Sequence, residues 1–238
     1  MHISLLIALT GCTSEGPGYS GYDMVDHFPL DGSERSWLYT NAAEEHKIFV
    51  EMAAERTEED VVIKTLEYWQ TDPNNNQPST LLYSIDWASD PIAGVRIYGY
   101  TFYSDPVEEV DTGDSGDTAD TSDSSTEEEG DESSVLAFDP PIQIGDRRMV
   151  PGDDIVTESG GSTWTATFES TEACPNDWVA GENTWTCLHI ILDDGDGDMS
   201  AGSPVSGEFW TAPRYGLSWF QLTGDTDKWI LATAKWEE

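Results

Sequence analysis

Short runs rich in β-branched and aromatic residues recur along most of this 238-residue chain, and turn-forming residues separate them. No apolar run of helical spacing and useful length occurs in the sequence. Many short strands spaced in this way predict an all-β fold: an antiparallel sheet, a sandwich or an open barrel. The strand candidates are residues 36–40, 47–52, 61–69, 80–87, 95–103, 135–138, 155–158, 163–168, 185–192, 208–211, 217–222 and 229–235.

One acidic tract interrupts this pattern. Residues 105–134 contain thirteen Asp and Glu side chains and no basic one, and Ser, Thr and Gly fill most of the rest. Such a segment cannot bury enough apolar area to offset the entropy lost on ordering, so we expect it to be disordered. It divides the β region into residues 23–104 and 135–238, either as a solvated insertion between neighbouring strands or as a linker between two domains.

The same tract contains Gly113-Asp114-Ser115-Gly116, which resembles the nucleophile motif of trypsin-like proteases. That motif acts only in an ordered loop, with a partner His and a buried Asp. Here it lies within a low-complexity run of Asp, Ser, Thr and Gly, so the sequence favours a chance match over a catalytic serine.

The charge of the chain is extreme. It has 47 acidic and 10 basic residues, a formal net charge of −37 and a pI near 4.1. A surface of this sign repels nucleic-acid phosphates and anionic lipid headgroups, so we expect no nucleic-acid partner and no purely electrostatic membrane binding. Ten Trp residues supply material for a core despite a mean hydropathy of −0.46.

The N-terminus carries the most specific motif. Leu9-Thr10-Gly11-Cys12 follows directly on the short apolar run Ile3–Leu9 and resembles the lipobox of bacterial lipoproteins. The resemblance implies that residues 1–11 are a signal peptide, that Cys12 carries lipid, and that Cys12 becomes the first residue of the mature protein. It also implies attachment to the membrane through acyl chains on Cys12, in the bacterial cell envelope and most simply at the outer membrane, with the membrane face left open.

A polar, glycine-rich stretch follows Cys12, so residues 12–22 are interpreted as a tether. The apolar run before it has only seven residues, which is too few to span a bilayer. The alternative is a buried N-terminal strand with an incidental cysteine.

A second resemblance covers most of the mature chain. Phe28-Pro29-Leu30 leads to Trp37-Leu38-Tyr39, and later Phe209-Trp210-Thr211-Ala212-Pro213 leads to Gly216-Leu217. This pair of motifs is similar to one in secreted β-rich bacterial lipoproteins, where it brackets a single antiparallel domain of no established activity. The resemblance implies one continuous domain and no mechanism.

The three cysteines divide into one lipid site and one pair. If Cys12 carries lipid, Cys174 and Cys187 remain for a disulfide in an oxidising compartment. A loop of this length would be stabilised by about 3 kcal/mol in the chain-entropy model. The alternative, a metal site built on the two cysteines, lacks nearby ligands at suitable spacing.

The only ligand-like cluster is Asp193-Asp194-Gly195-Asp196-Gly197-Asp198. Alternating carboxylates can point at one hard cation, and Asp194, Asp196 and Asp198 match the first, third and fifth positions of a calcium loop. The sixth position is Met199 and the twelfth is Val205, so the EF-hand pattern is incomplete. The sequence leaves open a Ca²⁺ site or a solvated acidic hairpin.

Catalytic signals are weak throughout the sequence. None of the histidines has zinc spacing, His189 fits a packed position better than a general base, and no nucleophile or nucleotide fingerprint is present. Trp210, Trp219 and Trp229 fit cross-strand core pairs better than a carbohydrate or lipid cleft. We therefore expect a non-catalytic, lipid-anchored envelope protein with a binding or structural role and an unidentified protein or glycan partner. The alternatives are a lipid-anchored hydrolase and a calcium-dependent surface binding module.

Overall fold

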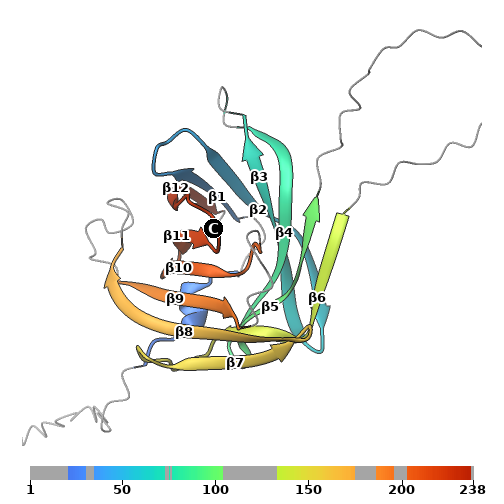
Figure 1. Cartoon of the computed structure of the whole chain (residues 1–238), viewed down its shortest axis with the longest axis vertical. Coiled ribbons are helices and arrows are strands. Elements are labelled where there is room, and N and C mark those ends of the chain that lie inside the picture. Colours follow the sequence, from blue (N-terminus) through green and yellow to red (C-terminus); the bar gives the residue numbers. More distant parts are fainter. Residues whose placement is uncertain are drawn as a thin grey trace, which may run out of the picture.

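The computed structural model of the chain describes residues 21–30, 35–72, 75, 77–103, 133–174, 186–195 and 203–236. They form twelve strands and one short 3-10 helix (Figure 1). The elements are η1 (Met24–His27), β1 (Arg35–Asn41), β2 (Lys47–Glu58), β3 (Val61–Thr71), β4 (Pro78–Asp90), β5 (Gly94–Tyr103), β6 (Ser133–Gly145), β7 (Asp154–Ser159), β8 (Ser162–Ala173), β9 (Thr186–Asp194), β10 (Gly207–Ala212), β11 (Gly216–Leu222) and β12 (Trp229–Trp236). The all-β prediction is confirmed, and each strand candidate lies within an observed strand apart from Trp185, which is outside these ranges.

All twelve strands belong to one antiparallel sheet, in the order β6-β5-β4-β3-β2-β1-β12-β11-β10-β9-β8-β7. Strands from both sides of the acidic tract are therefore members of the same sheet. The sheet curves until β6 and β7, the strands at the two ends of its order, lie close together (Figure 1). There the backbone N–H of Gln143 donates a hydrogen bond of 3.2 Å to Thr157 Oγ1. Of the three expected architectures, the open barrel is the one that corresponds to this nearly closed sheet.

The concave side of the sheet is lined by buried side chains in direct cross-strand register. Trp37 on β1 pairs with Val50 on β2, which pairs with Tyr68 on β3 and then with Tyr83 on β4. All four side chains are buried. Aromatic neighbours on one face of adjacent strands stabilise a sheet, and Tyr68 and Tyr83 are stacked with their ring centroids 4.5 Å apart.

A second row crosses the other half of the barrel. Phe168, Ile190, Phe209 and Phe220 face one another in turn across β8, β9, β10 and β11, and all four are buried. β1 and β12 join the two halves, because Tyr39 pairs with Leu231 in their ladder. The aromatic side chains of the two rows therefore help to fill the barrel.

The N-terminal segment 21–30 closes one end of the barrel. η1 begins after Asp23, whose Oδ1 accepts a hydrogen bond of 3.1 Å from the N–H of Val25. Met24 is completely buried, and its N–H donates to the carbonyl of Asp146 at 3.2 Å. Figure 1 shows η1, in blue, within the curve of the sheet. The sequence analysis did not predict this helix.

The connections between strands divide between the two ends of the barrel. The end that carries η1 is called the η1 end; it holds the start of β1, the last residue of β12, and the β2–β3, β4–β5, β6–β7, β8–β9 and β10–β11 connections. The opposite end holds the β1–β2, β3–β4, β5–β6, β7–β8, β9–β10 and β11–β12 connections. This division follows from the antiparallel order alone.

The structure corrects two of the boundaries expected from the sequence, those of the acidic tract and of the tether. Ser133 and Ser134, assigned to the acidic tract, belong to β6, and residues 104–132 lie outside the described ranges. Tyr22, assigned to the tether, belongs to the fold because it forms an isolated bridge with Met149.

Replacing residues 104–132 with a two-residue Asn-Gly turn should leave the melting temperature unchanged or slightly higher. Tyr103 and Ser133 face each other at the ends of β5 and β6, so a tight turn can connect them. Each halving of a flexible loop recovers about 0.6 kcal/mol of closure entropy. Thermal melts of the deletion, of the native chain and of a chain with the tract shuffled would test this. Loss of cooperative unfolding in the deletion alone would show that the tract contributes specific contacts.

Candidate functional site

Among the predicted site residues that the structure describes, the two cysteines lie apart from Asp194. Cys12, Asp196 and Asp198 lie outside the described residues, whereas Cys174, Cys187 and Asp194 lie within them. Cys187 is the second residue of β9 and Asp194 is its last, so the disulfide and the acidic cluster lie at opposite ends of that strand. The disulfide is at the η1 end.

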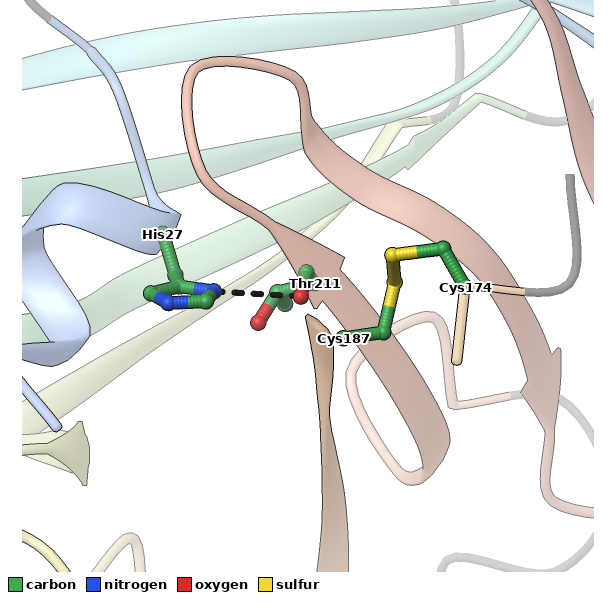
Figure 2. The surroundings of a disulfide bond; sticks show 4 residues. All are labelled: His27, Cys174, Cys187 and Thr211. Carbon is green, nitrogen blue, oxygen red and sulfur yellow. Dashed lines mark hydrogen bonds between the residues drawn. A yellow bond between two sulfur atoms is a disulfide. The ribbon is translucent and has the colours of Figure 1, made fainter. Parts of the chain in front are cut away.

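The predicted disulfide is present in the structure. It joins Cys174, immediately after β8, to Cys187 on β9, with 4.8 Å between the Cα atoms (Figure 2). Both cysteines are buried, with 6% and 0% of their surface exposed. A buried bridge between two neighbouring strands constrains the β8–β9 connection, which agrees with a stabilising role and not a redox one.

Asp194 lies in the barrel interior at the end opposite η1. Asp194 is 6% exposed. Its charge is one of the influences on the pKa of Tyr100 on β5. Burial raises the pKa of Tyr100, a hydrogen bond with Ser203 lowers it, and the Asp194 charge raises it again. No group of three or more potential metal ligands occurs among the described residues. Because Asp196 and Asp198 are outside these ranges, the Ca²⁺ site remains a prediction.

His27 connects η1 to the sheet at the disulfide end. Its Nδ1–H donates a hydrogen bond of 3.1 Å to the carbonyl oxygen of Thr211 on β10 (Figure 2). Burial lowers the pKa of His27 below its usual 6.5, and the hydrogen bond to Thr211 and the charges of Asp26 and Asp23 partly oppose that shift. Burial is the largest of these effects, so the ring is held neutral as a structural donor.

His27 should make stability depend on pH. Its folded-state pKa is lowered from 6.5, so on acidification the unfolded chain takes up this proton first and stability falls. His27→Gln should have a lower free energy of unfolding than the native chain at about pH 8. The difference in free energy between the two proteins should narrow below pH 6.5 by up to about 1.36 kcal/mol per pH unit. His46→Gln, at an exposed turn position, is the matched control. A gap between His27→Gln and the native chain that stays constant with pH would contradict the assignment.

A column of stacked rings occupies the convex side of the sheet. His189 on β9 stacks on Trp210 of β10 at 3.8 Å between centroids, and Trp210 stacks on Trp219 of β11 at 3.3 Å. Lys228 Nζ lies 4.7 Å from the centre of the Trp219 ring. Both faces of Trp210 are therefore occupied by protein groups, and a sugar ring cannot stack there.

Trp229 belongs to the other side of the sheet. It pairs with Phe220 and stacks on that buried ring, whereas Trp219 pairs with Ile230. Trp210, Trp219 and Trp229 thus do not converge on one cleft, and the expectation of cross-strand pairs is the one that the geometry supports.

Two carboxylates flank His189. Glu172 Oε1 lies 3.7 Å from Nδ1 of the ring and Glu208 Oε2 lies 3.3 Å from Nε2. The ring is thus held by stacking on Trp210 and by groups on both neighbouring strands. This agrees with the expectation of a packed histidine, because both ring nitrogens already face protein carboxylates.

One carboxylate has a perturbed acidity. Burial and the neighbouring charge of Glu67 raise the pKa of Glu51. The two residues face each other directly across β2 and β3, on the side opposite to buried Val50 and Tyr68. The pair therefore lies on the convex face of the sheet.

The apolar cavity at the η1 end is small. It measures about 30 Å³, which is the volume of one water molecule in the liquid. Residues from the N-terminal segment, β1–β4 and the β10–β11 turn line it, and they include Phe28, Trp37, Tyr68 and Trp87. Pockets for small molecules are roughly ten times larger or more. The interior at this end is filled by side chains.

Comparison of the chain with protein-family models, with curated proteins and with solved structures gave no match. In the part of the chain that the structure describes, no helix has the length and apolar character needed to cross a membrane.

Sequence reasoning missed the closure of the barrel end by residues 21–30. Asp23 is a typical N-cap residue and was a usable signal for η1. The contacts that bury Met24 and His27 come from Gly145, Asp146 and Thr211, far along the chain, and no local pattern indicates them.

Proposed function

We propose that this chain is a lipid-anchored protein of the bacterial cell envelope, in which a non-catalytic β-barrel domain is held at the membrane through Cys12. The domain serves a binding or structural role with a protein or glycan partner at its exposed surfaces. The outer membrane is the proposed location.

The structural observation that best supports the proposal is the placement of residues 21–30. They follow the tether directly and are built into the barrel end through the Tyr22–Met149 bridge and the burial of Met24. An anchor at Cys12 would therefore be connected to the whole sheet by a short segment. The small volume of the apolar cavity at the η1 end, about 30 Å³, supports recognition on the outer surface and not in that cavity.

Metabolic labelling with an alkyne-bearing fatty acid tests the anchor chemically. The native chain, expressed in a bacterium, should incorporate the label in a form that survives neutral hydroxylamine. That reagent cleaves thioesters, whereas the expected acyl groups are held by oxygen esters of a thioether-linked glycerol and by an amide. Cys12→Ser should incorporate none. Absence of label from the native chain would contradict the proposal.

A further inference from the structure

The basic residues of this acidic chain gather at the η1 end. Eight of the ten Lys and Arg residues lie in a connection at that end or in the half of a strand nearest to it. These eight are Arg35, Arg56, Lys64, Arg96, Arg147, Arg148, Arg214 and Lys235. The other two, Lys47 at the start of β2 and Lys228 before β12, lie at the opposite end.

Arg147 and Arg148 lie where the N-terminal segment enters the fold. The backbone of Gly21 is so close to Arg148 that an added Cβ would be 3.1 Å from the Cα of Arg148. Tyr22 exchanges backbone hydrogen bonds of 2.8 and 3.1 Å with Met149, the next residue. The two arginines are therefore adjacent to the point at which the tether leaves the domain.

The two arginines line an open hollow together with Asp23 and Asp146. Arg147 Nε lies 3.4 Å from Asp23 Oδ2, yet the Arg147 side chain is 56% exposed. Arg148 is exposed, and the described part of the chain offers it no ion pair. Both guanidinium groups can therefore reach a phosphate outside the domain, which is a partner that arginine binds well.

The opposite end is strongly acidic. The described connections carry acidic residues at both ends: Glu59, Asp60, Asp146 and Asp153 at the η1 end, and Glu44, Glu45, Asp225 and Asp227 at the opposite end. The thirteen acidic residues of the tract are attached to the same end, because the tract connects Tyr103 of β5 to Ser133 of β6. The two ends thus differ in charge because eight of the ten basic residues lie at the η1 end and the acidic tract is attached at the other.

We propose that the anchored domain stands on its η1 end, with Arg147 and Arg148 facing anionic lipid headgroups and the acidic end directed away from the membrane. This rests on the proposed lipid anchor. The tether from Cys12 to Gly21 reaches about 35 Å at most, so it keeps the domain near the surface without fixing its tilt. A negative surface attracts basic groups and repels acidic ones within a Debye length of about 8 Å. Asp23 and Asp146 lie beside the two arginines and weaken their attraction to the membrane. We therefore assign membrane attachment to the acyl chains, and only the orientation of the domain to the charges.

Energy transfer on vesicles tests the orientation without requiring acylation. The full chain with Cys12→Ser is attached through an N-terminal hexahistidine tag to a nickel-chelating lipid. A donor dye is placed at the η1 end with Ile92→Cys, or at the opposite end with Ala43→Cys; both positions are exposed turns. The remaining cysteines, Cys174 and Cys187, are paired in the disulfide. The vesicle surface carries an acceptor-labelled lipid.

On phosphatidylcholine vesicles containing phosphatidylglycerol, transfer from position 92 should exceed transfer from position 43 severalfold. The difference should shrink on pure phosphatidylcholine, at high salt, and in the Arg147→Gln, Arg148→Gln pair. It should persist in the Arg147→Lys, Arg148→Lys pair and in Lys47→Gln. Equal transfer from both positions on anionic vesicles, or a difference that the glutamine pair leaves intact, would overturn the proposal. Failure of the fatty-acid labelling would instead refute the anchor, so the two proposals fail separately.

Discussion

Cys12→Ser should move the protein from the membrane fraction to the soluble fraction of bacterial cells, with the membrane-bound share falling about tenfold or more. Each buried methylene of an acyl chain contributes about 0.8 kcal/mol to membrane affinity, and two or more chains anchor a protein stably. Serine lacks the thiol that accepts the diacylglyceryl group. The chain has a net charge of −37, so an anionic membrane repels it as a whole and does not retain it once the lipid is absent.

The control for this prediction is Thr13→Ser, which changes the tether and leaves the cysteine in place. Both variants should contain the Cys174–Cys187 disulfide and unfold at the native temperature, because the described fold begins at Gly21. If Cys12→Ser still sediments with membranes and needs detergent for release, the lipid anchor is wrong and the N-terminal residues have another role.

The strands could be predicted from the sequence, and the closure of the sheet could not. Alternation of buried and exposed positions is local, so β1 is already visible in Trp37 and Tyr39. The pairing of β1 with β12 joins residues such as Tyr39 and Leu231, which lie near the two ends of the chain. Nothing in either strand alone distinguishes that partner from a partner in a second, stacked sheet.

The faces of the tryptophans show a similar limit. Which side chains of neighbouring strands share a face depends on the pairing register and on β-bulges. One such irregularity lies between Trp210 and Thr211 in the β10–β11 ladder. The sequence alone does not give this register, so it cannot show that Trp219 and Trp229 lie on different faces. In the structure Trp219 pairs with Ile230 and Trp229 pairs with Phe220, so the two tryptophans lie on opposite sides of the sheet.

The disulfide was predictable because it required only counting: once Cys12 is assigned to lipid, two cysteines remain. η1 was not predictable, because it has only four residues and depends on tertiary contacts. Its sequence, Met24-Val25-Asp26-His27, has no amphipathic repeat, and its partners lie on β10 and in the β6–β7 and β10–β11 connections.

Met24→Ala should lower the free energy of unfolding of the domain by about 2–5 kcal/mol. Met24 is 0% exposed and packs so closely on β6 that a Cβ added to Gly145 would be 2.7 Å from the Met24 Cβ. Removing its side-chain atoms leaves a cavity between η1 and the sheet, where backbone bonds to Asp146 and Arg214 limit collapse. Urea denaturation should show a lower midpoint with an unchanged slope.

Two further variants separate the loss of packing from a general effect of substitution. Met24→Leu nearly conserves volume and should cost less than about 1.5 kcal/mol. Val156→Ala removes apolar atoms from a side chain that is 61% exposed, and it should change stability by no more than about 0.5 kcal/mol. If Met24→Ala were as mild as Val156→Ala, η1 would be a detachable end of the tether and not part of the barrel. The tether would then connect to the sheet only through the bridge between Tyr22 and Met149.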